Sequence, residues 1–363
     1  MKPKPHTLLC TVGTSLLGHA KNPEAPEQLK QALTNRRKQA ILDQLRLLEC
    51  TDRFCGAEIN TVTELLNSDR YVLQRIVFLV SDTAEGTLSG QILKEYFSER
   101  RNFSGTAVEY DVVSGLQDGD PKRFKTKGLP NLVRKIGDHI QTAGGPEFVA
   151  IDATGGYKAQ IAIAVLIGQA LDLPVFYKHE RFDAIIDFPP MPISLDFSVL
   201  AENAHLLVAL EREGTLTSDE ISGLDPKLRV FLNEEPCDDK VLYELNAVGQ
   251  IYLTAFRQRV PRRVKLDRAE SRKAPTFGND HHYPAGFKSF VNKIWSLSPW
   301  IETMHTIPFD PSAKKIGFAV KPFDGERALI GWFEHACFRV IIPDKSLDSL
   351  ALAADTLNRD YQQ

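Results

Sequence analysis

Two segments of the N-terminal half combine glycine, hydroxyl and lysine side chains in patterns that suit phosphate. The first is Thr11-Val-Gly-Thr-Ser15, and the second is Asp152-Ala-Thr-Gly-Gly-Tyr-Lys158. Glycine lets backbone N–H groups approach an anion closely, and each segment would lead into a helix whose N-terminus carries a partial positive charge. The threonine and serine hydroxyls can donate hydrogen bonds, and the lysine offers a positive charge. The two segments together predict a site for a phosphate-rich ligand.

The two segments differ from the common nucleotide-binding motifs. Gly155-Gly156-Tyr157-Lys158 lacks the spacing of a P-loop, and neither segment has the Gly-x-Gly-x-x-Gly pattern of a dinucleotide fingerprint. Two tight strand-to-helix turns without a ligand are therefore the alternative interpretation. A third segment, from Ser81 to Thr87, follows an apolar run and is a candidate for the same rim.

A block of basic residues lies in the C-terminal half, although the chain as a whole has a formal net charge of -3. Only Asp267 and Glu270 oppose it. Such a block favours contact with nucleic acid, and the alternative is a solvated helix end and linker. Its eight members are Arg257, Arg259, Arg262, Arg263, Lys265, Arg268, Arg272 and Lys273.

The first two hundred residues alternate strands with helices, which predicts βαβ units and a parallel sheet with helices on both faces. Ligands of such a sheet bind at the carboxyl ends of its strands, where both loops would lie. The expected strands are 6–11, 75–81, 107–113, 148–153 and 174–179. The expected helices are 28–48, 88–97, 129–143 and 157–171.

The pattern changes after the proline-rich segment 188–192, which marks a domain boundary. We expect helices over 203–212 and 241–257, with a capped helix start at Thr217 because Glu220 follows three residues later. With a wing near 235–240, these elements resemble a winged-helix unit. The remaining chain predicts a small α+β domain with a hairpin at Asp324-Gly325. Its expected helices are 287–297 and 346–361, and its expected strands are 315–320, 327–333 and 336–342.

Composition limits the class of protein. The chain has 363 residues, 43% hydrophobic and 25% charged, which is typical of a soluble protein of two or three domains. No apolar run reaches the roughly 20 residues that span a bilayer, and the N-terminus lacks the pattern of a signal peptide. The five dispersed cysteines indicate reduced thiols, so we expect a cytoplasmic protein with no membrane partner.

The pair of loops resembles the CARF domains of CRISPR-associated proteins. Val-Gly-Thr-Ser-Leu16 and Asp-Ala-Thr-Gly-Gly-Tyr-Lys158 carry this resemblance, which spans residues 1–190. It implies a Rossmann-like domain that forms a homodimer and binds cyclic oligoadenylate across the dimer axis, with cyclic tetra-adenylate as the expected ring. By this resemblance the ligand would be lined by Gly13, Thr14, Ser15, Leu16, Thr154, Gly155, Gly156 and Lys158.

The C-terminal part would then be the effector, and it lacks the signatures of the common nucleases. HEPN ribonucleases carry Arg followed four to six residues later by His, whereas seven residues separate Arg327 from His335. No expected strand offers the acidic-x-Lys of a PD-(D/E)xK nuclease, and His-Glu-x-x-His does not occur. Adjacent side chains in Asp280-His281-His282 would point to opposite sides, which disfavours a metal site. We therefore expect no metal and no cofactor other than the allosteric activator.

Residues 265–363 resemble the RelE family of ribonuclease toxins in element order, size and scattered basic residues, and residues 191–264 would form the winged-helix linker before them. This resemblance implies a metal-independent endoribonuclease that acts on mRNA in the ribosome. The 2′-hydroxyl of RNA would attack the adjacent phosphate, with cations stabilising the phosphorane and histidine transferring protons. The candidates for phosphate contact are Arg339, Arg327, Lys314 and Lys315. The candidates for proton transfer are His305, His335 and His282.

Two other functions stay open at this point. The first domain can itself be a ring nuclease that cleaves its cyclic ligand, with Ser15 and Lys158 as candidate residues. The winged-helix-like segment and the basic block can instead bind DNA, which would make the chain a ligand-responsive regulator. A regulator would not need the further folded residues that follow its DNA-binding part.

Overall fold

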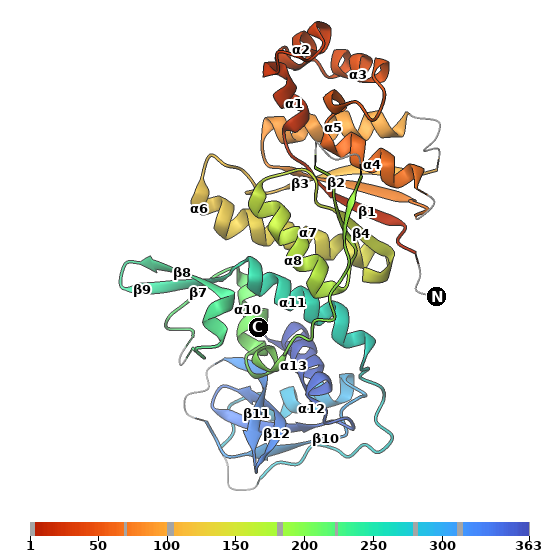
Figure 1. Cartoon of the computed structure of the whole chain (residues 1–363). Coiled ribbons are helices and arrows are strands. Elements are labelled where there is room, and N and C mark those ends of the chain that lie inside the picture. Colours follow the sequence, from red (N-terminus) through yellow and green to blue (C-terminus); the bar gives the residue numbers. More distant parts are fainter. Residues whose placement is uncertain are drawn as a thin grey trace. The chain divides into compact units, whose positions relative to one another are not determined.

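The computed structural model describes residues 4–68, 71–99, 105–179, 184–221, 224–278, 282–310 and 315–362 (Figure 1). The chain divides into two compact units, which we describe separately. The first unit comprises Met1–Ser194 and Asn246–Ala255, and the second comprises Leu195–Leu245 and Phe256–Gln363. Within the described ranges, no helix has the length and apolarity needed to cross a membrane.

The first unit is built on a six-stranded sheet in the order β3-β2-β1-β4-β5-β6. Its first five strands run parallel, as predicted, and β6 is antiparallel to β5. Strand order reverses between β1 and β4, and this reversal is where open α/β sheets bind ligands. The strands are β1 (Thr7–Thr11), β2 (Arg75–Ser81), β3 (Ala107–Val113), β4 (Val149–Asp152), β5 (Val175–Tyr177) and β6 (Ile186–Phe188).

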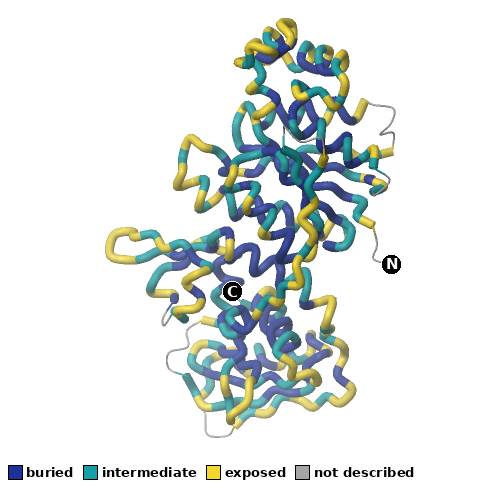
Figure 2. The backbone as a smooth tube through the Cα atoms, in the orientation of Figure 1, coloured by how far each residue is buried: buried dark blue, intermediate teal, exposed yellow. Residues whose placement is uncertain are grey.

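Helices cover both faces of this sheet, and Figure 2 shows its central strands buried. Leu8, Cys10 and Phe78 face α2 to α5, whereas α7 and α8 contact the sheet from the other face. The predicted helix 28–48 is two helices, because Arg36 takes the left-handed backbone conformation between them. The helices are α1 (Ser15–Gly18), α2 (Glu27–Thr34), α3 (Lys38–Leu47), α4 (Ala57–Asn67), α5 (Ala84–Ser98), α6 (Pro121–Arg123), α7 (Leu129–Thr142) and α8 (Lys158–Leu171). Helix α4 was not predicted.

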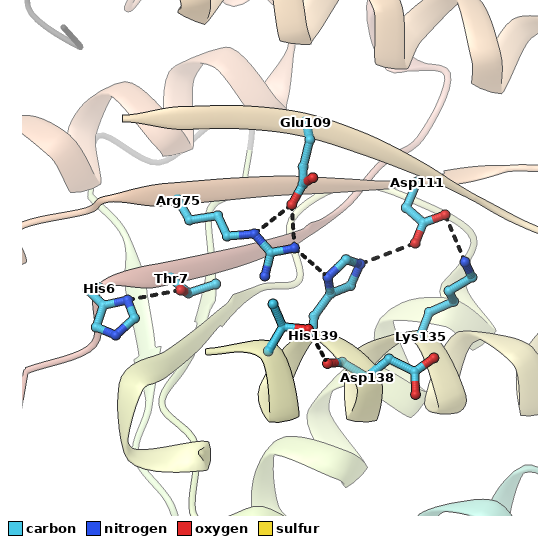
Figure 3. A network of polar contacts seen from close by, with 9 residues as sticks. His6, Thr7, Arg75, Glu109, Asp111, Lys135, Asp138 and His139 are labelled. Atoms are coloured by element: carbon cyan, nitrogen blue, oxygen red, sulfur yellow. Dashed lines mark hydrogen bonds and ion pairs between the residues drawn. The ribbon is translucent and has the colours of Figure 1, made fainter. Parts of the chain in front are cut away.

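A polar network fastens α7 to β2 and β3 (Figure 3). Arg75 Nε donates to Glu109 Oε1 at 2.5 Å, and Arg75 Nη2 lies 2.9 Å from His139 Nδ1. His139 Nε2 lies 3.2 Å from Asp111, which also accepts from Lys135 at 3.0 Å. Burial and the nearby Arg75 lower the pKa of His139. The neutral ring therefore accepts at Nδ1 and donates from Nε2, which satisfies both neighbours.

The second unit begins with α9 (Ser198–Glu202) and α10 (Ala204–Glu213) and a three-stranded antiparallel sheet, β7-β9-β8. Two predictions are wrong here. Thr217 ends strand β7 (Leu216–Thr217) and does not start a helix. The N–H and the hydroxyl of Thr217 both donate to the Glu220 carboxylate, and the two residues form a turn. Residues 241–245 belong to strand β9 (Lys240–Leu245). Helix α11 begins only at Ala247, in the stretch 246–255 that belongs to the first unit, and ends at Arg259.

Strand β9 pairs with β8 (Leu232–Cys237) along its whole length, and this pairing overrides the helical spacing of the sequence. The β8–β9 hairpin lies where the wing was predicted. The winged-helix assignment itself stays a prediction. The hairpin tip carries Glu234, Glu235, Asp238 and Asp239, so its charge is mainly acidic.

The rest of the second unit is an α+β arrangement around an antiparallel sheet, β10-β13-β12-β11. At the predicted hairpin, Asp324 and Gly325 both have positive φ (50° and 79°), which is the geometry of a type I′ turn. Asn358 closes the outer edge of β11, because its side chain accepts from Phe318 N at 2.9 Å and donates to Phe318 O at 2.7 Å. The elements are β10 (Thr303–Ile307), β11 (Ile316–Phe323), β12 (Glu326–Phe333), β13 (Ala336–Ile341), α12 (Phe287–Leu297) and α13 (Leu347–Tyr361).

Candidate functional site

The two loops singled out in the sequence meet at the carboxyl edge of the first sheet. Strands β1 and β4 are neighbours, with Cys10 opposite Asp152, so the segments that follow them lie side by side. A Cβ on Gly13 would stand 2.8 Å from the backbone nitrogen of Gly156, so only glycine allows this approach. A hollow of about 350 Å³ opens between the loops and is lined by Gly13, Thr14, Ser15, Ala57, Thr154, Gly155, Gly156, Tyr177, Lys178 and His179.

A carboxylate that the sequence analysis missed, that of Glu58, lies under the first loop. Glu58 is in the first turn of α4 and is 2% exposed. Its Oε1 accepts from Gly13 N at 2.8 Å, and its Oε2 accepts from Ser15 Oγ at 3.2 Å. A Cβ on Gly155 would lie 2.1 Å from Oε1, so the second loop also packs against this carboxyl group.

A second buried carboxyl, that of Asp152, ends strand β4. Its Oδ1 accepts from Thr154 N at 3.0 Å, and its Oδ2 is buried without a hydrogen-bond partner among the described residues. Burial raises the pKa of Asp152 to about 7, and the nearby Glu58 adds to the rise. Burial also raises the pKa of Glu58, and the hydrogen bonds from Gly13 and Ser15 offset part of that rise. Both effects arise because removal from water disfavours the charged carboxylate.

The end of strand β5 supplies the wall opposite the first loop, and the sequence analysis missed this too. Tyr177, Lys178 and His179 line the hollow. Thr154 Oγ1 accepts from Lys178 N at 2.9 Å, which ties the second loop to this strand. Lys178 Nζ is ion-paired with Glu64 of α4. No spacing rule links positions 154 and 178, so only the parallel pairing of β4 with β5 brings them together.

The structure gathers most, but not all, of the predicted ligand residues. Gly13, Thr14, Ser15, Thr154, Gly155 and Gly156 line the hollow. Leu16 is 3% exposed and belongs to the apolar core of the unit. Lys158 is exposed at the start of α8 and is not among the lining residues. Within the third segment, Thr83 and Glu85 line a neighbouring hollow of about 650 Å³ together with Thr14 and Tyr157.

In the second unit, two of the predicted catalytic residues lie side by side on neighbouring strands. Arg339 of β13 pairs with His305 of β10 in the antiparallel register, so their side chains share one face. Both are half-buried. His305 Nδ1 lies 2.5 Å from Thr276 Oγ1, which fixes the orientation of the ring. The arrangement unites a cation that can hold a phosphate with an imidazole that can transfer a proton.

Other side chains of the same face surround Arg339. Its guanidinium lies 5.5 Å from the centre of the Phe323 ring and 3.9 Å from the carboxylate of Glu326. Lys321 of β11 has its ammonium 4.8 Å from the centre of the Trp332 ring. The cations of this face can contact the phosphates of RNA, whereas the Trp332 ring is 5% exposed and packs against His205.

The remaining catalytic candidates lie elsewhere. Arg327 is displaced by an odd number of register positions from Ile330, the partner of Arg339, so it lies on the opposite face. Lys315 precedes β11 and bonds to Glu220 at 2.9 Å. His335 is in the β12–β13 turn and contacts the ring of Phe309. His282 is exposed, and Lys314 lies outside the described residues, as do Asp280 and His281.

Arg257 and Arg272 of the basic block serve the fold. Arg257 Nη1 donates to Glu211 at 2.6 Å and its Nη2 donates to Asp355 at 3.1 Å. Arg272 donates to Ile301 O at 3.0 Å, and its guanidinium lies 4.3 Å from the centre of the Trp295 ring. These two arginines bind the second unit together, so the block is not a uniform surface for nucleic acid.

Residues 53–191 match the family described as CRISPR-associated protein (Cas_APE2256). The matched stretch includes Glu58, the 152–158 loop and Lys178. No curated protein matches the chain.

Similar solved structures include the following two, both at low TM-score. Can2 from Sulfobacillus thermosulfidooxidans, in complex with cyclic tetra-adenylate, has 10% identity and a TM-score of 0.26 over 92% of this chain and 75% of its own. Protein VC1899 from Vibrio cholerae has 10% identity and a TM-score of 0.29 over 93% and 77%.

Proposed function

We propose that this chain is a CRISPR-associated effector that binds cyclic oligoadenylate in its first unit and is thereby activated to cleave RNA with its second unit. The observation that carries the proposal is the hollow between the β1 and β4 loops, most of whose lining residues lie in the stretch matched to a CRISPR-associated family. The two loops also carry the resemblance to CARF domains. Cyclic tetra-adenylate is the ring we expect to act.

The hollow suits part of such a ring. Thr14, Ser15 and Thr154 offer hydroxyls, and the 14-residue helix α8 starts just after Gly156. A helix N-terminus favours phosphate. At about 350 Å³ the hollow is at the lower end of small-molecule sites, and a ring of four nucleotides is larger. Two copies of the hollow in a homodimer would share one ring, which agrees with the dimer that we expect.

The proposed cleavage uses no metal. His305 accepts the proton of the 2′-hydroxyl or supplies one to the leaving 5′-oxygen through Nε2, because Thr276 occupies Nδ1. Arg339 stabilises the charge of the phosphorane. One imidazole is half of an acid–base pair, so the ribosome is proposed to hold the mRNA and complete the site.

The DNA-binding alternative has less support than RNA cleavage. The expected helix after Thr217 is a turn, and the tip of the β8–β9 hairpin is acidic, which would repel the DNA backbone. Ring cleavage by the first unit can coexist with the proposal. Linear products formed from cyclic tetra-adenylate during a long incubation would reveal it.

One experiment tests the proposal in two stages. Thermal unfolding is measured with cyclic tetra-adenylate, cyclic hexa-adenylate and linear oligoadenylate, and mRNA cleavage is then measured with and without ribosomes. A ring at one hundred times its dissociation constant should stabilise the folded state by about 2.7 kcal/mol. The proposal is wrong if no ring raises the unfolding temperature, or if a bound ring leaves mRNA intact under both conditions.

A further inference from the structure

The donors that an anionic ligand would use in the first loop are already bonded to an internal anion. Gly13 N and Ser15 Oγ are both directed at the Glu58 carboxyl group, at 2.8 Å and 3.2 Å. Glu58 comes from α4 and not from either loop, and it is 2% exposed. The carboxyl group thus occupies the donors that the phosphate-binding interpretation of this loop would offer to an oxygen of the ligand.

A second carboxyl group lies beneath the same hollow. Asp152 is fully buried, and its Oδ2 has no partner among the described residues. Gly155, which lines the hollow, leaves no room for a Cβ against Glu58 Oε1. The ligand's phosphates would therefore lie near two carboxyl groups that are themselves buried away from water. Like charges in such surroundings repel strongly.

We propose that Glu58 is the internal occupant of the anion site and that an anionic ligand binds together with a proton, which the buried Glu58–Asp152 pair takes up from solvent. This inference rests on the proposed function, since it describes how the same hollow accepts its ligand. Proton transfer is the only chemical change in this step. The proton joins a carboxylate oxygen, no covalent bond breaks, and one negative charge is removed for each proton gained.

Protonation changes what the loop can offer. When Glu58 is ionised, its Oε2 can only accept, so the Ser15 hydroxyl must donate to it. When Oε2 carries the proton it can donate to Ser15 Oγ, and the serine proton is then available to a phosphate oxygen. Gly13 N keeps its partner at Oε1 in both states. The ligand therefore gains a donor and loses a repelling charge in one step.

Burial already raises the pKa of both carboxyl groups, to about 7 for Asp152, and the negative charge of a bound ligand would raise both further. Among the described residues, the titratable groups near the pair include Cys10 of β1 and the side chains at the end of β5. Burial raises the pKa of the Cys10 thiol, so this thiol stays protonated. At the end of β5, Lys178 is ion-paired with Glu64, and His179 lines the hollow. Uptake of a solvent proton by His179, favoured by the charge of a bound anion, is the competing explanation, and the experiment must separate the two.

The test is calorimetric titration with cyclic tetra-adenylate in buffers of different ionisation enthalpy, from pH 6.5 to 8.5. The difference between buffers counts the protons exchanged. We expect uptake of up to one proton, and an affinity that rises by up to about tenfold per pH unit as the pH falls. Glu58→Gln should bind more tightly at pH 8.5 and lose most of the uptake, because the amide mimics the protonated acid. The Asp152→Asn variant should lose the part of the proton uptake that Glu58→Gln retains.

His179→Asn is the matched control and should keep the pH slope of the wild type. Loss of the slope in His179→Asn, or its retention in both carboxyl variants, overturns the inference. If the wild-type protein binds the ring and takes up no proton, that result alone overturns the inference. If no ring binds at all, the proposed function is wrong, and the titration is repeated with inorganic triphosphate. Triphosphate that binds without proton uptake, or that does not bind, then overturns the role of Glu58 as well.

Discussion

Arg339 and Arg327 are on adjacent strands of one sheet, but they face opposite sides of it. Arg339 pairs with His305 and lies near Phe323, whereas Arg327 shares the face of Leu329, which is fully buried. Side chains alternate along a strand, so an odd register offset is enough to separate the two. Charge alone therefore does not identify a catalytic residue here.

Arg339→Ala is expected to lower ring-activated mRNA cleavage by roughly 10²-fold to 10³-fold, the loss typical of removing one transition-state donor. Arg339→Lys should recover only part of the activity, because lysine cannot make a bidentate contact. The measurement is the single-turnover rate on ribosome-bound mRNA. Arg327→Ala is the control on the opposite face and should stay within a few-fold of the wild type. Equal losses in the two alanine variants would contradict the assignment.

His305→Asn is expected to slow cleavage by about 10² to 10⁴ and to change the pH dependence of the rate, because the group that transfers the proton is gone. His335→Asn should keep both rate and profile, since it lies in the β12–β13 turn. Rates measured across pH 5.5 to 8.5 decide the matter. A pH profile unchanged in His305→Asn would assign proton transfer to another group.

The buried Asp152 should make the protein less stable as the pH rises. Its pKa is about 7 in the folded state against an ordinary value of 3.8, so the stability is complete below pH 4 and is lost as the pH rises toward 7. The loss amounts to at most about 4 kcal/mol. Asp152→Asn should flatten this fall, as measured by urea unfolding at several pH values. The exposed Asp43→Asn should keep the wild-type slope, and a slope retained in Asp152→Asn would disprove the assignment.

At the scale of elements, the β11 edge shows how the second unit protects its sheet. An unpaired strand edge invites pairing with another chain, and the Asn358 side chain occupies both backbone groups of Phe318. Its Nδ2 also lies 2.8 Å from Ala354 O, so the residue is held from helix α13. The helix thus both covers the core and closes the edge.

Asn358→Leu should therefore destabilise the protein by about 2 to 4 kcal/mol, because it leaves buried backbone groups without partners and alters packing. Chemical unfolding measures the loss, and light scattering would report association through the opened edge. Asp360→Ala, two residues later and exposed, should change stability by no more than about 0.5 kcal/mol. If both variants unfold alike, the edge contact is unimportant.

At the scale of the whole molecule, the proposed function requires the two units to respond to each other. Coupling is reciprocal: a ring that promotes RNA engagement must itself bind more tightly when RNA or ribosome is present. The ring affinity measured with and without ribosomes tests this relation directly. Equal affinities would show that the first unit senses a ligand without transmitting the signal.

Gly155→Ala should abolish activation by the ring, because its Cβ would stand 2.1 Å from Glu58 Oε1 and push the two loops apart. The measurement is the ratio of mRNA cleavage with and without cyclic tetra-adenylate. Gly18→Ala is the control, since a Cβ there meets open space and the residue is helical. A stimulated Gly155→Ala variant would place the ligand elsewhere.

The sequence by itself determined the elements whose signals are local. A continuous apolar run predicted β2, and residues 107–113 were predicted as the next strand, both with the observed ends. Asp324-Gly325 predicted its turn, and the glycine and hydroxyl residues marked both loops. The prediction of a helix over 241–245 was wrong. The six residues of strand β9 are followed closely by helix α11, and the spacing of apolar residues in both segments fits a helix.

Only the tertiary structure decided which distant residues are in contact. Glu58 bonds to a loop 43 to 45 residues away, Lys178 joins Thr154 through strand pairing, and His305 faces Arg339 because β10 lies beside β13. It also separated Arg327, Lys315 and His335 from that pair. Local propensity fixes which segments form strands and helices, but the choice of neighbours, register and face depends on how the whole chain buries its apolar surface.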